Sequence, residues 1–253
     1  MTYPLLTFEN TSYLDIGEGQ PVILLHGLFG SLSNFDEVIQ ALSQKYRILL
    51  PQLPIFQCDL KDANLDGLFS FLERFVDILQ LDNFSILGNS LGGHLGLKYV
   101  LAYPHKVNNL ILTASSGLFE NALGSSYPRK DRESLRAKIG ETFGDPKFAT
   151  DELVDNVIEI INNKMKLLKI IKMAKSATRQ NLQNELSKIK NNTLLIWGSI
   201  DTITPDFVAH QFHESISNST LHFIEGVGHA PMMESPDVFS KLVLDFYQQI
   251  DFA

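Results

Sequence analysis

Short apolar runs alternate along the chain with longer segments of helical periodicity. Six of these runs are rich in Val, Ile, Leu and Phe at successive positions, which predicts strands buried on both faces. They span 22–26, 46–50, 84–87, 110–113, 193–197 and 221–224. Residues 5–16 predict an additional antiparallel edge. Because helical segments separate the runs, the pattern is typical of an α/β protein with a mostly parallel sheet and helices on both faces.

The helical periodicity is clearest in two segments. Apolar residues at i, i+3, i+4 and i+7 predict an amphipathic helix over 65–79. A second helix is predicted near the C-terminus, where Ser235-Pro236 supplies an N-cap and a first-turn residue. Its apolar positions are Val238, Leu242, Phe246 and Ile250.

The alternation breaks after Thr113, and the next predicted strand begins only at Thr193. The segment 119–190 between them has helical patterns and is basic on balance, whereas the rest of the chain is strongly acidic. We therefore predict a core domain formed by 1–118 and 191–253, with 119–190 as a helical insertion that covers the sheet.

Composition narrows the classes of function. A chain of 253 residues with 44% hydrophobic residues can bury the core of a globular domain. The net charge of -8 argues against a nucleic-acid partner, because phosphate binding needs clustered Lys and Arg. The single cysteine, Cys58, cannot form an intramolecular disulfide. With no signal peptide and no apolar run long enough to span a bilayer, the sequence favours the cytoplasm and excludes stable membrane insertion.

The candidate chemistry begins at a serine turn. The segment 88–92 reads Gly-Asn-Ser-Leu-Gly, between the predicted strand 84–87 and a helix that starts near Leu91. A G-x-S-x-G motif in that context is typical of a nucleophile elbow, which exposes Ser90 above the sheet edge. The Leu91 N–H at the helix start would then point at an oxyanion formed beside the serine.

Ser90 needs a base, and the base needs a group that fixes its tautomer. Asp201 follows the predicted strand 193–197, and His229 lies in a glycine-flanked loop after 221–224. Catalytic groups of open α/β sheets gather at the carboxyl ends of the strands, where all three residues are expected. Glu120, Asp206, Glu225 and Glu234 are alternatives to Asp201, and Glu225 is the most serious of them.

A fourth strand-end feature is His26-Gly27, directly after the strand of residues 22–26. The loop can bring a second backbone N–H to the oxyanion, from Leu28 or, as the competing choice, from Phe29. We interpret His26 itself as a buried residue that satisfies loop backbone groups. His94 is a possible lining residue of the site, and His210 and His213 share a helix face that we interpret as solvated rather than metal-binding.

These features together resemble the α/β-hydrolases, in the broad family of small serine hydrolases. The resemblance rests on His26-Gly27, the elbow 88–93, Asp201 and Gly228-His229, and it covers nearly the whole chain. It implies the α/β-hydrolase fold, with a central sheet of about eight strands and a helical cap over 119–190. It also implies that Ser90 is the nucleophile, His229 the general base and then acid, and Asp201 its orienting carboxylate, with Leu28 and Leu91 as oxyanion donors and no cofactor or metal.

The substrate prediction is a small, moderately apolar carboxylic ester bound by a monomer or homodimer. The predicted substrate-binding residues, most of them apolar, are Phe29, Asn89, Leu118, Phe119, Met165, Met232 and Met233. One alternative is carbon–carbon bond hydrolysis of a vinylogous diketone acid, with Arg179 or a cap lysine holding a carboxylate. The other is a non-catalytic binding protein with a hydrolase-like fold. A serine nucleophile argues against epoxide hydrolases and haloalkane dehalogenases, which need a carboxylate there.

The basic and apolar segment 164–175 has two interpretations. Its composition is typical of an interfacial helix that touches anionic lipid. We favour a cap helix that turns apolar side chains to the pocket and lysines to water.

Overall fold

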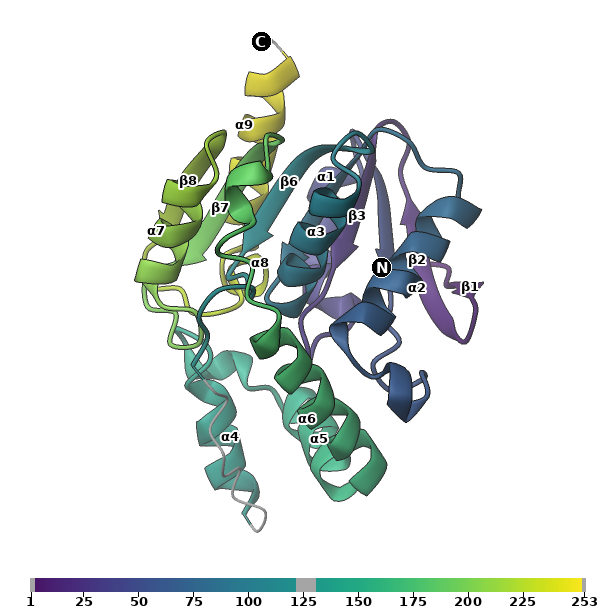
Figure 1. Cartoon of the computed structure of the whole chain (residues 1–253). Helices are drawn as coiled ribbons and strands as arrows, with labels where there is room; N and C mark the ends of the chain where they lie inside the picture. The colour runs from purple at the N-terminus through teal and green to yellow at the C-terminus, as the bar shows by residue number, and fades with distance from the viewer. Residues whose placement is uncertain (1–2, 122–130, 252–253) are drawn as a thin grey trace.

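The computed structural model describes residues 3–121 and 131–251 and has an eight-stranded sheet at its centre (Figure 1). The strands are β1 (Leu6–Phe8), β2 (Thr11–Ile16), β3 (Pro21–Leu25), β4 (Arg47–Pro51), β5 (Phe84–Asn89), β6 (Val107–Thr113), β7 (Asn192–Gly198) and β8 (Ser219–Ile224). Their order in the sheet is β1-β2-β4-β3-β5-β6-β7-β8. β1 and β2 pair antiparallel with their neighbours, and all other neighbouring strands are parallel. The predicted α/β fold, with its antiparallel edge, is confirmed.

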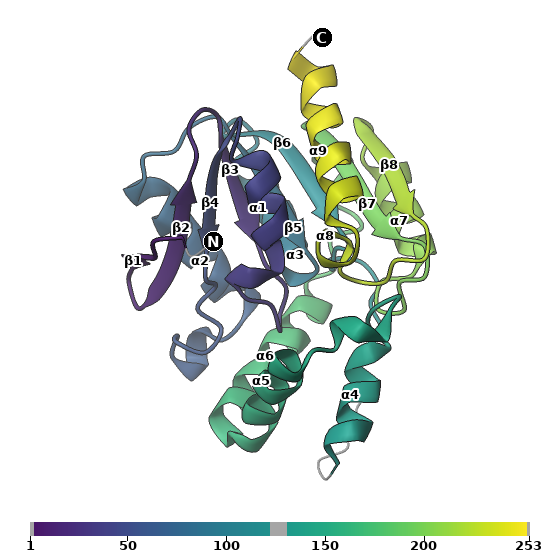
Figure 2. The ribbon, with the colours of Figure 1, turned by 180° about the vertical axis from the view of Figure 1, so that it is seen from behind.

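Helices cover both faces of the sheet. The face seen in Figure 1 carries α2 (Leu65–Ile78), α3 (Leu91–Ala102) and α7 (Asp206–Ser215). The opposite face, seen in Figure 2, carries α1 (Asp36–Leu42) and α9 (Pro236–Asp251), which pack against each other. The short helix α8 (Pro231–Glu234) precedes α9. Within the described ranges, no helix is both long and apolar enough to cross a membrane.

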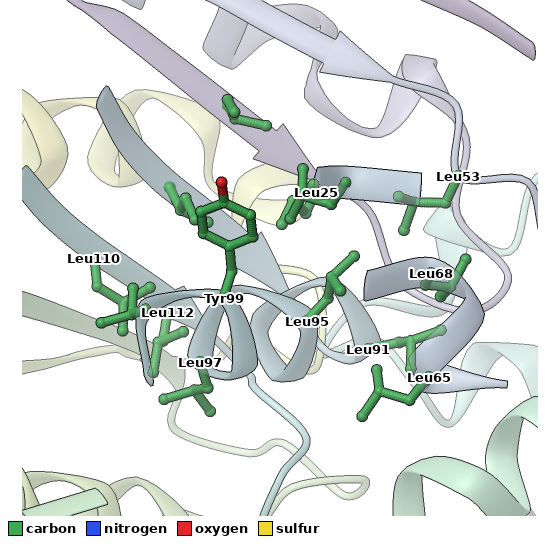
Figure 3. Close-up of a cluster of buried hydrophobic side chains, with 14 of the residues drawn as sticks. Leu25, Leu53, Leu65, Leu68, Leu91, Leu95, Leu97, Tyr99, Leu110 and Leu112 are labelled. Carbon is green, nitrogen blue, oxygen red and sulfur yellow. The ribbon is translucent and has the colours of Figure 1, made fainter. Parts of the chain in front are cut away.

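The nucleophile helix α3 is buried on almost every side, because it packs on β3, β5 and β6 and is covered by α2. Its pattern is accordingly apolar all round rather than amphipathic. Figure 3 shows three of its side chains, Leu91, Leu95 and Tyr99, among leucines of β3, β6 and α2. This packing fixes the start of α3, and with it the position of Ser90, relative to the sheet.

The helices between β6 and β7 lie beyond the carboxyl ends of the strands, at the lower end of the molecule in Figures 1 and 2. They are α4 (Arg132–Gly140), α5 (Asp151–Asn162) and α6 (Lys164–Arg179). A small apolar cluster of their own includes Leu135, Val154 and Val157. The predicted division at 118/119 and 190/191 stays a prediction, and its stretch 122–130 lies outside the described residues.

The strand prediction is wrong in one respect. Residues 221–224 were expected to be buried on both faces, yet only Ile224 of β8 is buried. β8 is the last strand in the sheet order, so it has a neighbour on one side only. An apolar run does not reveal whether its strand lies at the centre or at the edge of a sheet.

Candidate active site

Ser90 lies at the sharp turn between β5 and α3. Its backbone has φ +53° and ψ −117°, a conformation that residues with a side chain rarely adopt and that often marks a functional site. The turn leaves no room around it. A methyl group at Gly88 would lie 2.5 Å from the carbonyl oxygen of Gly92, and one at Gly92 would lie 2.1 Å from that of Leu25. The close approach of these backbones explains why glycine flanks the serine at both positions.

Asp201 and His229 meet at the same edge of the sheet as Ser90. Asp201 follows β7 and His229 follows β8, and both side chains are buried. His229 Nδ1 lies 2.9 Å from Asp201 Oδ2. The carboxylate also accepts hydrogen bonds from the N–H groups of Ile203 and Thr204, at 2.8 and 3.0 Å, and from Thr204 Oγ1 at 2.8 Å. These donors hold the carboxylate in one orientation toward the imidazole.

The pair shifts the titration of both partners. Burial disfavours the charged form of His229, but the adjacent charge of Asp201 and their hydrogen bond outweigh it and raise the pKa of His229 above its ordinary 6.5. Burial likewise acts against the Asp201 carboxylate, yet His229 and the hydrogen bonds from Thr204 lower the pKa of Asp201 below 3.8. With the carboxylate at Nδ1, the proton of the neutral ring sits there and Nε2 is left as the basic nitrogen.

Ser90 and His229 line one cavity of about 1140 Å³. Asp201 lies behind the imidazole and does not line it. Within the described residues, the Ser90 hydroxyl makes no hydrogen bond, so the serine and the histidine face a common space without being joined. Such contacts are often long in the absence of substrate and shorten when it binds.

Two backbone N–H groups beside Ser90 suit an oxyanion. Leu28 and Leu91 both line the cavity, and within the described part of the chain neither N–H donates a hydrogen bond. The loop of Leu28 lies against the elbow, since a methyl group at Gly27 would be 3.3 Å from the Ser90 Cβ. Phe29 also lines the cavity, so the choice between Leu28 and Phe29 stays open.

His26 holds this loop in place. Its Nδ1 donates to the carbonyl of Gly27 at 2.8 Å, and its Nε2 accepts from the N–H of Leu53 at 2.9 Å. Burial lowers the pKa of His26 to about 4, so the ring is neutral and has the tautomer that these bonds require. The interpretation of His26 as a buried structural residue is confirmed.

Asn89 needs a correction. It was predicted to bind substrate, and it does line the cavity. Its amide nitrogen, however, donates to two main-chain carbonyls, of Thr113 at 3.1 Å and of His229 at 3.2 Å. Asn89 therefore ties the histidine loop to the residue next to the nucleophile, which is a positioning role.

Glu234 supports the same loop from the other side. Its carboxylate accepts the N–H groups of Gly228 and Ala230, which flank His229, and that of Gly144 at 2.7 Å. The sequence suggested Glu234 only as an alternative to Asp201. No local pattern indicates the role, because it depends on a contact between α8 and a residue before α5 that is distant in the chain.

Four predicted substrate-binding residues do not line the cavity. Leu118 and Met232 are buried in the hydrophobic core, whereas Phe119 and Met165 are exposed outside the cavity. Met233 lines it in place of its neighbour Met232. These assignments failed because the side-chain direction in a short helix or loop cannot be read from an apolar residue alone.

Cap helices α5 and α6 supply the apolar wall of the cavity. The residues that contribute most of it are Leu153, Val157, Ile160, Leu167 and Ile170. The expectation that the α6 lysines face water is wrong for Lys169, which is buried and donates to the carbonyls of Phe56 and Cys58 at 2.8 and 2.6 Å. This lysine fastens α6 to the core.

The remaining alternatives lie away from the imidazole of His229. Glu225 is exposed, and Asp206 caps its own helix by accepting the N–H of Phe207. His94 is buried outside the cavity lining, with its Nε2 2.9 Å from the carbonyl oxygen of Gln180. His213 contacts the Ser219 hydroxyl at 2.9 Å.

An eight-stranded, mostly parallel sheet with a strained serine after its fifth strand defines an α/β protein of the hydrolase class. Comparison with known sequences agrees with that class. The chain belongs to the alpha/beta hydrolase fold family, whose sequence profile matches residues 20–236.

Similar proteins include more than one kind of hydrolase. The chain is 29% identical to the 2-hydroxy-6-oxononadienedioate/2-hydroxy-6-oxononatrienedioate hydrolase 1 of Pseudomonas putida, over 94% of this chain and 91% of that protein. It is 25% identical to the human monoacylglycerol lipase ABHD6, over 92% of this chain and 77% of the lipase. Among solved structures, it resembles MGS-MChE2, an alpha/beta hydrolase enzyme from a lagoon-sediment metagenome, with a TM-score of 0.82 and 34% identity over 98% of this chain and 99% of that chain.

Proposed function

We propose that the protein is a serine hydrolase that cleaves carboxylic esters through an acyl-enzyme on Ser90. The observation that carries the proposal is the buried His229–Asp201 pair, joined at 2.9 Å, beside a serine in a strained turn of the same cavity. A carboxylate-oriented imidazole is the group that turns a serine hydroxyl into a nucleophile. The hydrolases among the relatives support this class of reaction.

The proposed reaction has two halves. His229 Nε2 accepts the Ser90 proton as the alkoxide attacks the ester carbonyl, and the Leu28 and Leu91 N–H groups stabilise the oxyanion. The protonated imidazole then gives its proton to the leaving alcohol. Water, deprotonated by His229, attacks the acyl-enzyme in the same way and restores the serine. Asp201 stabilises the imidazolium at each step and holds its tautomer.

The cavity supports a larger acyl group than the small esters suggested by the sequence. Its volume of about 1140 Å³ exceeds the usual range of small-molecule sites, roughly 300–1,000 Å³. The wall formed by α5 and α6 is apolar over the side chains of Val157, Ile160 and Ile170. We therefore propose a medium-length aliphatic acyl chain lying along these helices.

A panel of p-nitrophenyl esters tests the proposal. We expect kcat/KM to rise by about tenfold or more from acetate to octanoate, because each buried methylene contributes about 0.8 kcal/mol. Stopped-flow absorbance at the nitrophenolate band, at equal ester concentrations, gives the comparison. A chain-length series that falls steadily from acetate would contradict the proposed acyl site.

Carbon–carbon bond hydrolysis is the second candidate. Lys175 and Arg179 line the cavity and have no acidic partner among the described residues, which suits a substrate carboxylate. The Pseudomonas putida relative adds support through its printed activity. A ring-cleavage dienoate belongs in the same panel, and faster cleavage of that acid than of every ester would favour this candidate.

A further inference from the structure

A polar patch interrupts the apolar lining of the cavity beside the nucleophile. It consists of Ser116, Glu120, Asn121 and Thr178, all of which line the cavity. The patch joins the loop after β6 to the last turn of α6, so it lies where the cap meets the core. None of these residues has a role in the proposed ester-cleavage steps.

Glu120 is the centre of this patch, and its carboxylate is only partly satisfied. Oε2 accepts a hydrogen bond from the buried Ser116 hydroxyl at 2.6 Å. Oε1 lies 3.3 Å from Thr178 Oγ1, but that hydroxyl has one proton and a closer acceptor, the Ala174 carbonyl at 3.0 Å. A carboxylate offers about four acceptor positions. Within the described residues no Lys or Arg pairs with Glu120, so most of its acceptor capacity is unused.

The patch lies next to the reacting groups. The N–H of Ser116 donates to the carbonyl of Ser90 at 3.1 Å, which couples the patch to the elbow. The charge of Glu120 also acts on His229, where it adds to the larger effect of Asp201 in raising the pKa. Because His229 protonates the leaving alcohol, a group close to both Ser90 and His229 lies on the alcohol side of the scissile bond.

The chemistry of the patch selects a hydrogen-bond donor. An ionised carboxylate only accepts, so it repels anions and binds hydroxyl or ammonium groups. Lys175 and Arg179 line the same cavity next to Thr178, and their positive charges offset the field of Glu120. A neutral donor is therefore favoured over a cation.

From this juxtaposition we infer that Glu120 is a specificity-determining residue that binds hydroxyl groups on the alcohol part of the substrate. The inference rests on the proposed ester hydrolysis and names the alcohols that this site prefers: polyhydroxylated rather than plain alkyl. Ser116 holds one carboxylate oxygen in place, and the other oxygen binds the substrate.

A matched pair of esters tests the inference. Glycerol 1-monobutyrate and n-propyl butyrate share their acyl group and carbon skeleton and differ by two hydroxyls in the alcohol. A hydrogen bond to a charged group is worth about 10- to 100-fold in rate or affinity. We expect the wild-type protein to prefer the glycerol ester in kcat/KM by about that factor, measured by pH-stat titration of released butyrate.

Glu120→Gln should lower this preference about tenfold, and Glu120→Asp, which withdraws the carboxylate by one methylene, should lower it as well. Glu225→Gln removes the same charge from an exposed position outside the cavity and should retain the wild-type preference. Comparing the ratio between variants cancels the intrinsic reactivity of the two esters. Loss of the Glu120 charge should also move the acidic limb of the kcat/KM profile to lower pH, because it lowers the pKa of His229.

The outcomes separate the two proposals. If the wild-type protein cleaves both esters and the Glu120 variants keep the same ratio, the polyol inference is overturned and ester hydrolysis stands. If the folded wild-type protein cleaves neither ester, nor any p-nitrophenyl ester, the proposed function fails and the inference fails with it. Thermal unfolding of each variant shows that it is folded before its ratio is compared.

Discussion

Replacing Ser90 with alanine is expected to lower kcat for ester hydrolysis by roughly four to six orders of magnitude while the protein stays folded. The loss follows from removal of the only atom that forms the acyl-enzyme, and losses of this size are found when one member of such a unit is removed. Stability should change little. Within the described residues the Ser90 hydroxyl makes no hydrogen bond, and alanine has the same Cβ in the strained turn.

The control for this variant is Ser187→Ala, at an exposed serine outside the cavity. It should retain wild-type turnover of the preferred p-nitrophenyl ester. Thermal unfolding of Ser90→Ala, followed by circular dichroism, should give a midpoint close to that of the wild type. Turnover of Ser90→Ala within about tenfold of the wild type would show that another group is the nucleophile.

Asp201→Asn is the second large effect, with an expected loss of about ten-thousandfold in kcat. The surroundings dictate how the asparagine must lie. Its carbonyl oxygen stays with the N–H groups of Ile203 and Thr204, which bind Oδ1 of the native carboxylate. The amide nitrogen then takes the position of Oδ2 and faces His229. His229 must accept at Nδ1 and carry its proton on Nε2, so it cannot deprotonate the serine.

The pH dependence provides a separate readout of the same pair. His229 acts as a base only when it is neutral, so the wild-type kcat/KM should rise with pH through a midpoint above 6.5. Removing the Asp201 charge should move the midpoint of the residual activity downward. Asp206→Asn, at an exposed carboxylate, is the matched control and should keep both rate and midpoint. A wild-type midpoint below 6.5 would contradict the charge pair.

The same shifts predict how the pair contributes to stability. The raised pKa of His229 stabilises the fold below about pH 6.5, and this contribution is lost as pH rises through the folded value. The lowered pKa of Asp201 stabilises it above about pH 3.8, and this contribution is lost as pH falls through its folded value. The pair is therefore most stabilising between these two values.

The sequence predicted the sheet because buried strands require continuous apolar runs, and the six runs correspond to β3 through β8. It also placed Ser90, Asp201 and His229 at one edge, since each follows a strand and parallel strands end on the same side. The Asp201–His229 contact agrees with that reasoning. The role of Ser90 as nucleophile stays a prediction until the serine is tested chemically.

The rest of the site depends on contacts between distant segments. Asn89 binds the carbonyl of His229, and Glu234 binds the N–H of Gly144, and neither partner can be inferred from local pattern. The apolar wall depends on how α5 and α6 are rotated over the sheet. That rotation sends Met165 to the surface and Ile170 into the cavity, although both residues are apolar and lie on one helix.

The central claim, that His229 and Asp201 activate Ser90, is tested most directly by labelling with a fluorophosphonate and locating the adduct by peptide mass spectrometry. The wild-type protein should be modified at Ser90, the Ser90→Ala protein should remain unmodified, and Asp201→Asn should react far more slowly. A folded wild-type protein that resists the probe would agree with a non-catalytic binding protein. That result, or an adduct on a residue other than Ser90, would contradict the account.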